Sequence, residues 1–306
     1  MVRLKKARGI LYVFIAMFVL GVALVPICYG QGETKEAEQP AAAPAAAPAE
    51  EPAAEAPCGP TVNINTTLFS KYVWRGYELS KDSFVIFPQV TVSYKGLSIR
   101  WWGDIDTNYG GDVSGIEPDG LQCWEQDYIA YYSNSYKKLN YTLGYIFYHT
   151  HAHVNADNQE VWVALGLSNW FNPTFSAWRD VKRTGDSWYF NFAVSHSFPI
   201  PKDCFSLCYD WSFDVGGWVS YYDQDHYWQP RTHPKSDYSG FHDGQVWAGL
   251  KIPLSDVCSI TPKLQYSFPL STKARNNIKG VSGDAVRGQH GDANFLYGGL
   301  ILDYNF

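Results

Sequence analysis

From about residue 60 to its end, the chain alternates apolar and polar residues with a period of two. In the segment from Phe84 to Tyr94, apolar residues hold the even positions, and polar residues such as Gln89 share the odd ones. The same alternation recurs in four further segments, 97–106, 139–147, 160–168 and 188–198. Because successive side chains of a strand point to opposite faces, this pattern predicts β-strands with one apolar and one polar face.

No stretch after residue 60 keeps a helical period over three turns. The alternation and the turn residues predict about twelve strands, which gives an even count. They are expected at 61–75, 83–95, 97–107, 124–135, 139–150, 158–168, 173–182, 186–198, 205–221, 241–253, 257–268 and 292–306.

The connections between these strands alternate in length. Short ones follow even-numbered strands, at Gly96, 136–138, 169–172, 199–204 and 254–256. Long ones follow several odd-numbered strands, at 108–123, 222–240 and 269–291. Short turns on one side and long loops on the other are typical of bacterial outer-membrane barrels. The pattern therefore predicts an all-β fold, a transmembrane antiparallel up-and-down β-barrel with its apolar face toward lipid.

Aromatic residues occur at both ends of single strands. Phe84 and Tyr94 lie ten residues apart on one face, and Trp188 and Phe198 repeat that spacing. Ten residues of a tilted strand span about 25 Å, the height of the apolar band between the aromatic girdles of a membrane barrel. We therefore assign most of the aromatic residues to girdles and to a lipid-facing wall.

The last residues form an alternating strand that stops on an aromatic residue. Tyr304 and Phe306 share the apolar face with Leu302. This resembles the C-terminal signal by which the barrel-assembly machinery recognises outer-membrane barrels. We expect that machinery, together with outer-membrane lipid and lipopolysaccharide, to be partners of the chain.

The first 57 residues differ in composition from the rest. Residues 1–30 have four cations, no acids and an apolar run, which is the order of a cleaved secretory signal peptide. A transmembrane anchor is the alternative. Residues 31–57 consist mostly of Ala, Pro and Glu, with six glutamates and one lysine, and predict a disordered periplasmic linker. The barrel is expected over 58–306.

Composition narrows the class of protein. The 306 residues include 51 aromatics, too many for a disordered chain. The net charge of −6 argues against a nucleic-acid partner, which would favour a basic stripe. We expect the polar faces to line a lumen and its charged residues to set ion preference. The expected pore-lining residues are Arg100, Asp104, Asp106, Glu125, Asp127, Glu160, Asp210, Asp214, Lys251, Lys263 and Asp303.

Histidines and cysteines provide two further candidate sites. His149, His151 and His153 alternate at the end of one predicted strand, so their side chains should lie on one side of it and could bind a divalent metal ion. Loop histidines without a metal are the alternative. Cys204 and Cys258 lie in neighbouring short connections and are the expected disulfide pair.

The first predicted strand carries the run Ser70-Lys71-Tyr72-Val73-Trp74-Arg75-Gly76. Ser70, Tyr72, Arg75 and Gly76 match a Ser-x-Tyr-x-x-Arg-Gly pattern, so the run resembles the opening motif of the TorF-type porin family. The resemblance covers roughly the first fifty barrel residues and implies passive diffusion across the outer membrane.

The expected function is therefore a porin for small polar or cationic solutes in a bacterial outer membrane, with no cofactor. One alternative is a plugged barrel with a structural role or a cell-wall tether. Another is an outer-membrane enzyme, which would need a serine and a histidine placed together. Ser195 and His196 are adjacent in sequence, so they should point to opposite faces, and we expect no catalytic residues.

Overall fold

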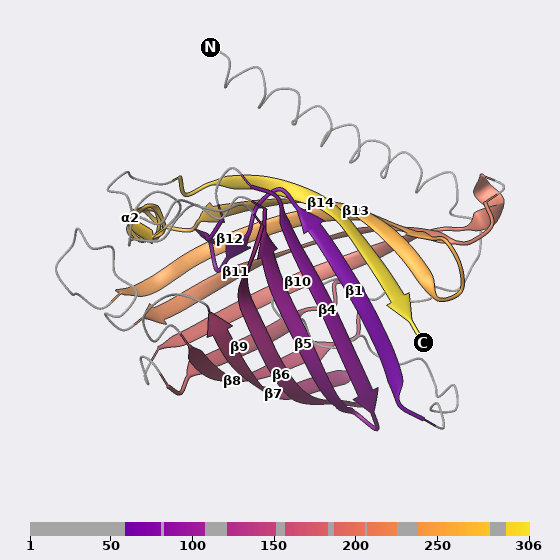
Figure 1. Cartoon of the computed structure of the whole chain (residues 1–306), viewed down its shortest axis with the longest axis horizontal. Coiled ribbons are helices and arrows are strands. Elements are labelled where there is room, and N and C mark those ends of the chain that lie inside the picture. The colour runs from indigo at the N-terminus through magenta and orange to yellow at the C-terminus, as the bar shows by residue number, and fades with distance from the viewer. Residues whose placement is uncertain are drawn as a thin grey trace, which may run out of the picture.

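A computed structural model of the chain describes residues 59–80, 83–107, 121–150, 157–182, 187–205, 207–224, 238–281 and 292–306. The predicted signal peptide, linker, His151 and His153 lie outside these residues. Twelve antiparallel strands form a closed barrel in the order β1-β14-β13-β12-β11-β10-β9-β8-β7-β6-β5-β4 (Figure 1). The predicted β-barrel and its strand count are confirmed.

The twelve wall strands alternate in direction around the ring. They are β1 (Thr61–Phe69), β4 (Val85–Tyr94), β5 (Leu97–Asp106), β6 (Gln122–Tyr136), β7 (Leu139–Thr150), β8 (Asn158–Leu167), β9 (Thr174–Asp180), β10 (Trp188–Ile200), β11 (Trp211–Gln224), β12 (Tyr238–Pro253), β13 (Cys258–Pro269) and β14 (Phe295–Asn305). A separate two-stranded sheet consists of β2 (Val73–Trp74) and β3 (Tyr77–Glu78).

The first and last strands close the ring. Asn63 pairs with Asn305 and Phe69 with Gly299, in antiparallel register. Backbone hydrogen bonds between Val62 and Phe306 extend this seam to the last residue, with N–O distances of 3.0 and 2.9 Å. A closed ring leaves no unpaired strand edge, as a membrane barrel requires.

The two rims differ in their connections. The rim with the C-terminus, here called the turn rim, has the short connections and the 3-10 turn η1 (Lys202–Cys204). The opposite rim, the loop rim, has the long connections and helix α2 (Thr272–Val281). Figure 1 shows α2 and the C-terminus at opposite ends of the barrel. No helix among the described residues has the length and apolar character needed to cross a membrane.

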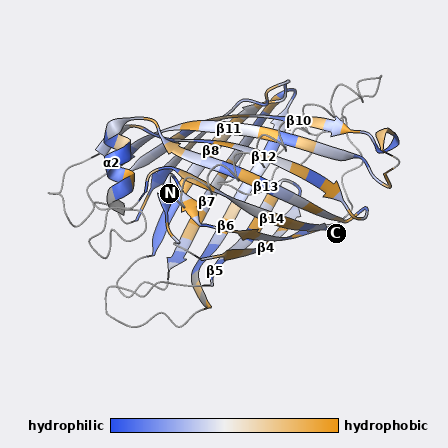
Figure 2. Ribbon diagram, turned by 90° about the horizontal axis from the view of Figure 1, so that it is seen from above, coloured by the Kyte–Doolittle hydropathy of each residue, from blue (hydrophilic) through white to orange (hydrophobic). Residues whose placement is uncertain are grey.

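The outer face of the barrel is apolar, as the alternation predicted. Ile99 and Leu143 each expose 64% of their surface, and Leu165 exposes 45%. Figure 2 shows hydrophobic stretches along the strands between the two rims. Exposed aliphatic residues in this number would be unfavourable in water and suit contact with lipid.

The prediction that the aromatic residues belong mainly to a lipid-facing wall is wrong in part. Many rings face inward and are buried. They include Phe69, Tyr72, Tyr77, Phe87, Trp162, Trp178, Tyr189, Tyr222, Tyr238, Trp247, Phe295 and Tyr297. The lumen therefore contains an aromatic core in addition to polar side chains.

Two inward tryptophans lie over cross-strand glycines. Trp162 pairs with Gly144 on the neighbouring strand, and Trp247 pairs with Gly216. A Cβ atom added to Gly216 would lie 2.5 Å from the Trp247 ring, and one added to Gly144 would overlap Trp162. The glycines thus provide the space that each indole occupies against the inner wall.

Candidate functional site: a hairpin inside the barrel

The segment 70–80 leaves the wall and folds into the lumen at the loop rim. We call it the inner hairpin; it contains β2, a two-residue turn and β3. The turn residues Arg75 and Gly76 have positive φ angles of 48° and 79°. Two successive positive φ angles are characteristic of the type I′ turn of a tight hairpin, for which glycine is favoured at the second position. The first predicted strand was expected to continue to residue 75, and this boundary is wrong, because β1 ends at Phe69.

The four residues that resemble the family motif all belong to this feature. Ser70 joins the hairpin to the seam, since its backbone N–H donates to the Gly298 carbonyl at 3.0 Å. Tyr72, Arg75 and Gly76 lie within the hairpin itself. The motif therefore marks an inward turn of the chain rather than the end of a wall strand.

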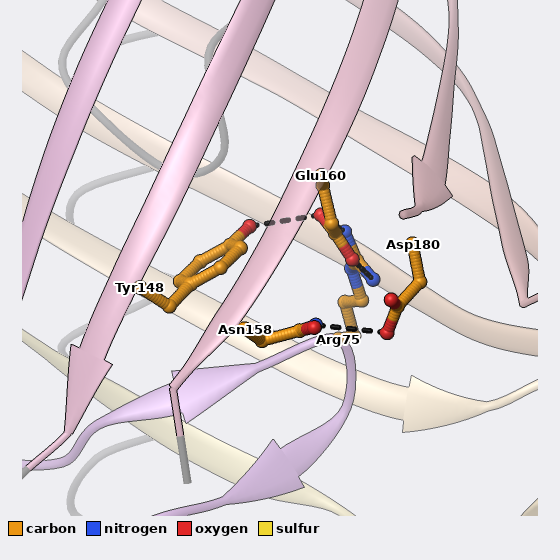
Figure 3. Close-up of polar contacts among 5 residues, drawn as sticks. All are labelled: Arg75, Tyr148, Asn158, Glu160 and Asp180. Atoms are coloured by element: carbon orange, nitrogen blue, oxygen red, sulfur yellow. Dashed lines mark hydrogen bonds and ion pairs between the residues drawn. The ribbon is translucent and has the colours of Figure 1, made fainter. Parts of the chain in front are cut away.

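Arg75 connects the tip of the hairpin to the wall. Its guanidinium donates two hydrogen bonds to the Glu160 carboxylate on β8, at 2.8 and 2.6 Å (Figure 3). Tyr148 also donates to Glu160, at 2.9 Å. The Arg75 and Glu160 side chains expose only 7% and 4% of their surface. A bidentate ion pair with this burial fixes both the position and the orientation of the Arg75 side chain.

Aromatic rings surround the guanidinium of Arg75. Its Cζ atom lies 4.4 Å from the Trp74 ring centroid and 4.5 Å from that of Tyr189. Trp178 and Tyr222 are farther away, each at 5.8 Å. These rings belong to β2, β9, β10 and β11, so one side chain contacts a wide arc of the wall through cation–π interactions.

Tyr72 attaches the first arm of the hairpin to the opposite arc. Its hydroxyl donates to Glu125 on β6 at 3.0 Å, and its ring packs on Phe87 of β4 at a centroid distance of 5.2 Å. Its backbone N–H donates to the Ser80 hydroxyl at 2.6 Å. Lys71 and Glu78 form an ion pair between the two arms.

The second arm packs against β12 and α2. The fully buried Tyr77 donates to Asn277 of α2 at 2.6 Å. His242 of β12 lies 5.2 Å from the Tyr77 ring, and its Nε2 is 3.1 Å from the Arg75 carbonyl oxygen. Ile278 of α2 is also fully buried. Helix α2 thus covers the hairpin from the loop rim.

Two further ring contacts join Trp74 to Tyr148 of β7 and Tyr72 to Trp102 of β5. With these, the inner hairpin contacts every wall strand from β4 to β12. Those are nine consecutive strands of the twelve-strand ring. The hairpin therefore fills the lumen near the loop rim.

A cavity of about 190 Å³ remains on the turn-rim side of the hairpin. We call it the chamber. Hairpin residues from Lys71 to Arg75 form its roof, and its wall extends to Asn172 and Thr174 beside a turn-rim connection. Eleven of the residues that line it are aromatic. Arg100, Asp127 and Lys263 also line it.

Most of the predicted pore-lining residues face inward. Asp104, Asp106, Glu125, Asp127, Glu160, Asp214 and Lys263 are buried, and Arg100, Lys251 and Asp303 are half-buried. Asp210 is an exception and corrects the prediction, because it is exposed in the connection before β11, where it accepts a hydrogen bond from the Lys202 backbone. The aromatic lining and the hairpin were not expected from the sequence.

The histidine and cysteine sites differ from expectation. His149 lies 3.0 Å from Asp157, and its two predicted partners lie outside the described residues. Within the described part of the chain, no group of three His, Cys, Asp or Glu residues could hold a metal ion. Cys204 is disulfide-bonded, whereas Cys258 is a free thiol, so the predicted pairing of these two is wrong.

Ser195 and His196 lie on opposite faces of β10. Ser195 lines the chamber, whereas the His196 ring stacks on Trp170 at a centroid distance of 4.1 Å and its Nδ1 is 2.7 Å from the Trp170 carbonyl oxygen. Adjacent strand residues diverge in this way, as the sequence predicted. These two residues cannot act together on one substrate.

No protein-family model and no curated protein matches the chain. Among solved structures, LpxR from Salmonella typhimurium is similar with 10% identity and a TM-score of 0.47, over 80% of this chain and 99% of that chain. An anion-selective porin from Comamonas acidovorans is similar with 11% identity and a TM-score of 0.32, over 81% and 99%. A loop-deletion mutant of OmpT, an outer membrane protein of Vibrio cholerae, is similar with 10% identity and a TM-score of 0.30, over 81% of this chain and 98% of that chain. At TM-scores below 0.5, these similarities carry no argument about function.

Proposed function

We propose that the chain is a bacterial outer-membrane barrel whose lumen is closed at rest, and that it passes small solutes only when the inner hairpin moves. The observation that carries the proposal is the ring of hairpin contacts from β4 to β12. A lumen filled by side chains in this way leaves no wide path for free diffusion, in contrast to larger open porins.

The opened lumen would favour cations or small polar solutes. Among the predicted pore-lining residues that face inward, seven are carboxylates and three are cations. A ring of acidic side chains favours cations. Membership of the TorF-type family is part of the same proposal and rests on the four motif residues of the hairpin.

Recordings from the refolded full chain in planar bilayers test this function. The wild type should show no steady conductance, whereas a variant with residues 71–79 replaced by a Gly-Ser chain of equal length should show steps with cation selectivity. Lys202→Ala, which changes an exposed cation at the turn rim, is the control and should remain silent. Steady conductance of the wild type equal to that of the variant would contradict closure. Silence of both proteins would favour a plugged structural barrel.

A further inference from the structure

The chamber has a charged group that the rest of the protein leaves unpaired. Lys263 of β13 is buried, with 5% of its surface exposed, and lines the chamber. The chamber's other lysine, Lys71, is paired with Glu78, and Arg75 in the roof is paired with Glu160. Among the described residues, the Lys263 ammonium has no ion-pair partner and no hydrogen-bond acceptor, and its Nζ atom lies 4.3 Å from the Trp247 ring centroid.

No carboxylate of the described residues forms an ion pair with this lysine. Asp214 interacts with Lys263 electrostatically, but it accepts its hydrogen bond from Ser197 at 2.6 Å. Asp127 also faces the chamber, but it is on β6, five steps from β13 in the twelve-strand ring and so almost across the lumen. A buried ammonium group without a partner is costly, and a bound anion would remove that cost.

The remaining wall of the chamber suits an aromatic ring. Trp102, Phe87 and Trp218 line it together with eight other aromatic side chains. Aromatic rings favour stacked or edge-on contacts with one another. In another protein, an apolar cavity of about 150 Å³ holds benzene. The chamber, at about 190 Å³, has room for one ring and a small acidic group.

We propose that the chamber binds a small aromatic carboxylate, with its ring among the aromatic side chains and its carboxylate on Lys263. Arg100, which also lines the chamber, donates to Thr91 and Tyr131 and has no carboxylate partner among the residues described. Arg100 is on β5, next to the strand of Asp127 and four steps from β13, so Lys263 alone makes its own side of the chamber favourable to an anion. The acidic residues Glu125 and Glu160, in contrast, bind the hairpin itself.

Ligand binding in the chamber does not require conduction through the barrel. The inner hairpin forms the roof, and the wall reaches the turn rim at Asn172 and Thr174. A ligand would therefore enter from the turn rim while the hairpin remains in place. A barrel that never conducts could still bind it.

Binding of benzoate and of benzyl alcohol to the purified full chain in detergent tests the proposal by calorimetry. The wild type should bind benzoate at least about tenfold more tightly than benzyl alcohol, because a charge-assisted hydrogen bond is worth about that factor. Lys263→Gln should weaken benzoate binding about tenfold and leave benzyl alcohol binding unchanged. Ala193→Leu, which adds volume to the chamber wall, should weaken both.

Lys251→Gln is the matched control, because Lys251 is a lysine of the neighbouring strand that does not line the chamber. It should leave both affinities unchanged, and circular dichroism would verify that every variant keeps its β-structure. Three results would overturn the proposal: no binding of benzoate by the folded wild type, unchanged benzoate affinity in Lys263→Gln, or tighter binding of benzylammonium than of benzoate.

Discussion

Arg75 and Glu160 are 85 residues apart in sequence, and two hydrogen bonds of 2.8 and 2.6 Å join their side chains inside the barrel. The pair connects the tip of the inner hairpin to β8 on the wall. Because both groups are buried, each depends on the other for its charge to be compensated.

Removal of either partner should destabilise the barrel more than removal of both. Arg75→Ala should lower the free energy of unfolding by about 3–5 kcal/mol, because it leaves the Glu160 charge buried and unpaired. The double variant Arg75→Met with Glu160→Met should lower the free energy of unfolding by clearly less, because it leaves no buried charge unpaired. Guanidinium unfolding in detergent micelles, followed by tryptophan fluorescence, measures both. Equal losses in the single and double variants would show that the ion pair is not what holds the hairpin.

The turn of the hairpin should tolerate no side chain at Gly76. Its φ is 79°, and an added Cβ would lie 2.9 Å from Cβ of Asp243 and 3.0 Å from Cδ1 of Ile278. Gly76→Ala should therefore cost about 1–3 kcal/mol and loosen the hairpin. Limited trypsin digestion measures this, since cleavage after Arg75 requires the tip to leave the lumen. Gly59→Ala, at a position with open space around it, is the control and should be cut no faster than the wild type.

The Gly144–Trp162 pair predicts a second effect of an added methyl group. Gly144→Ala should push the Trp162 indole off its place on the inner wall and cost about 1–3 kcal/mol through overpacking. The melting temperature in detergent should fall accordingly. The same fall with Gly59→Ala would contradict the steric explanation, because a Cβ added there would meet no atom within 4 Å beyond its chain neighbours.

We propose that the alternating strand with Tyr304 and Phe306 serves as an assembly signal, so Phe306 should matter for assembly more than for the stability of the finished barrel. Phe306→Ala should reduce the fraction of chain assembled in the outer membrane of expressing cells, as measured by fractionation and surface labelling. Phe171→Ala is the matched control, because Phe171 exposes 61% and Phe306 exposes 65% of its surface. Equal assembly of both variants with the wild type would contradict the proposed role of the C-terminal strand.

The period-two alternation was sufficient to predict the wall. It reports which face of a strand meets lipid, and lipid imposes the same requirement on every strand, so Ile99 and Leu143 follow one rule. The rule fails at Lys71–Trp74, where the alternation continues although the chain has left the wall. The rings of Tyr72 and Trp74 face an aromatic lumen, and an aromatic lumen selects the same residue types as a lipid interface.

The candidate site was only partly predictable for a similar reason. Inward charges such as Asp104 and Lys263 follow from strand parity, but their partners depend on which strands meet across the lumen. One signal could have located the hairpin, namely the Arg75-Gly76 pair between two short alternating segments, which fits a two-residue turn. The partner of Arg75 could not be read from it, because Glu160 is brought near only when the ring closes.

The seam between β1 and β14 has a consequence for the order of events during biogenesis. Asn63 donates to Asp303, 240 residues later, at 2.9 Å, so the ring can close only after the chain through β14 has been synthesised. The inner hairpin is made before the nine strands from β4 to β12 that surround it, and β12 begins more than 150 residues after it. Non-local pairing of this kind slows folding. The aromatic side chains of the hairpin therefore lack most of their partners until the later strands pair, and the step that closes the lumen is among the last to be completed.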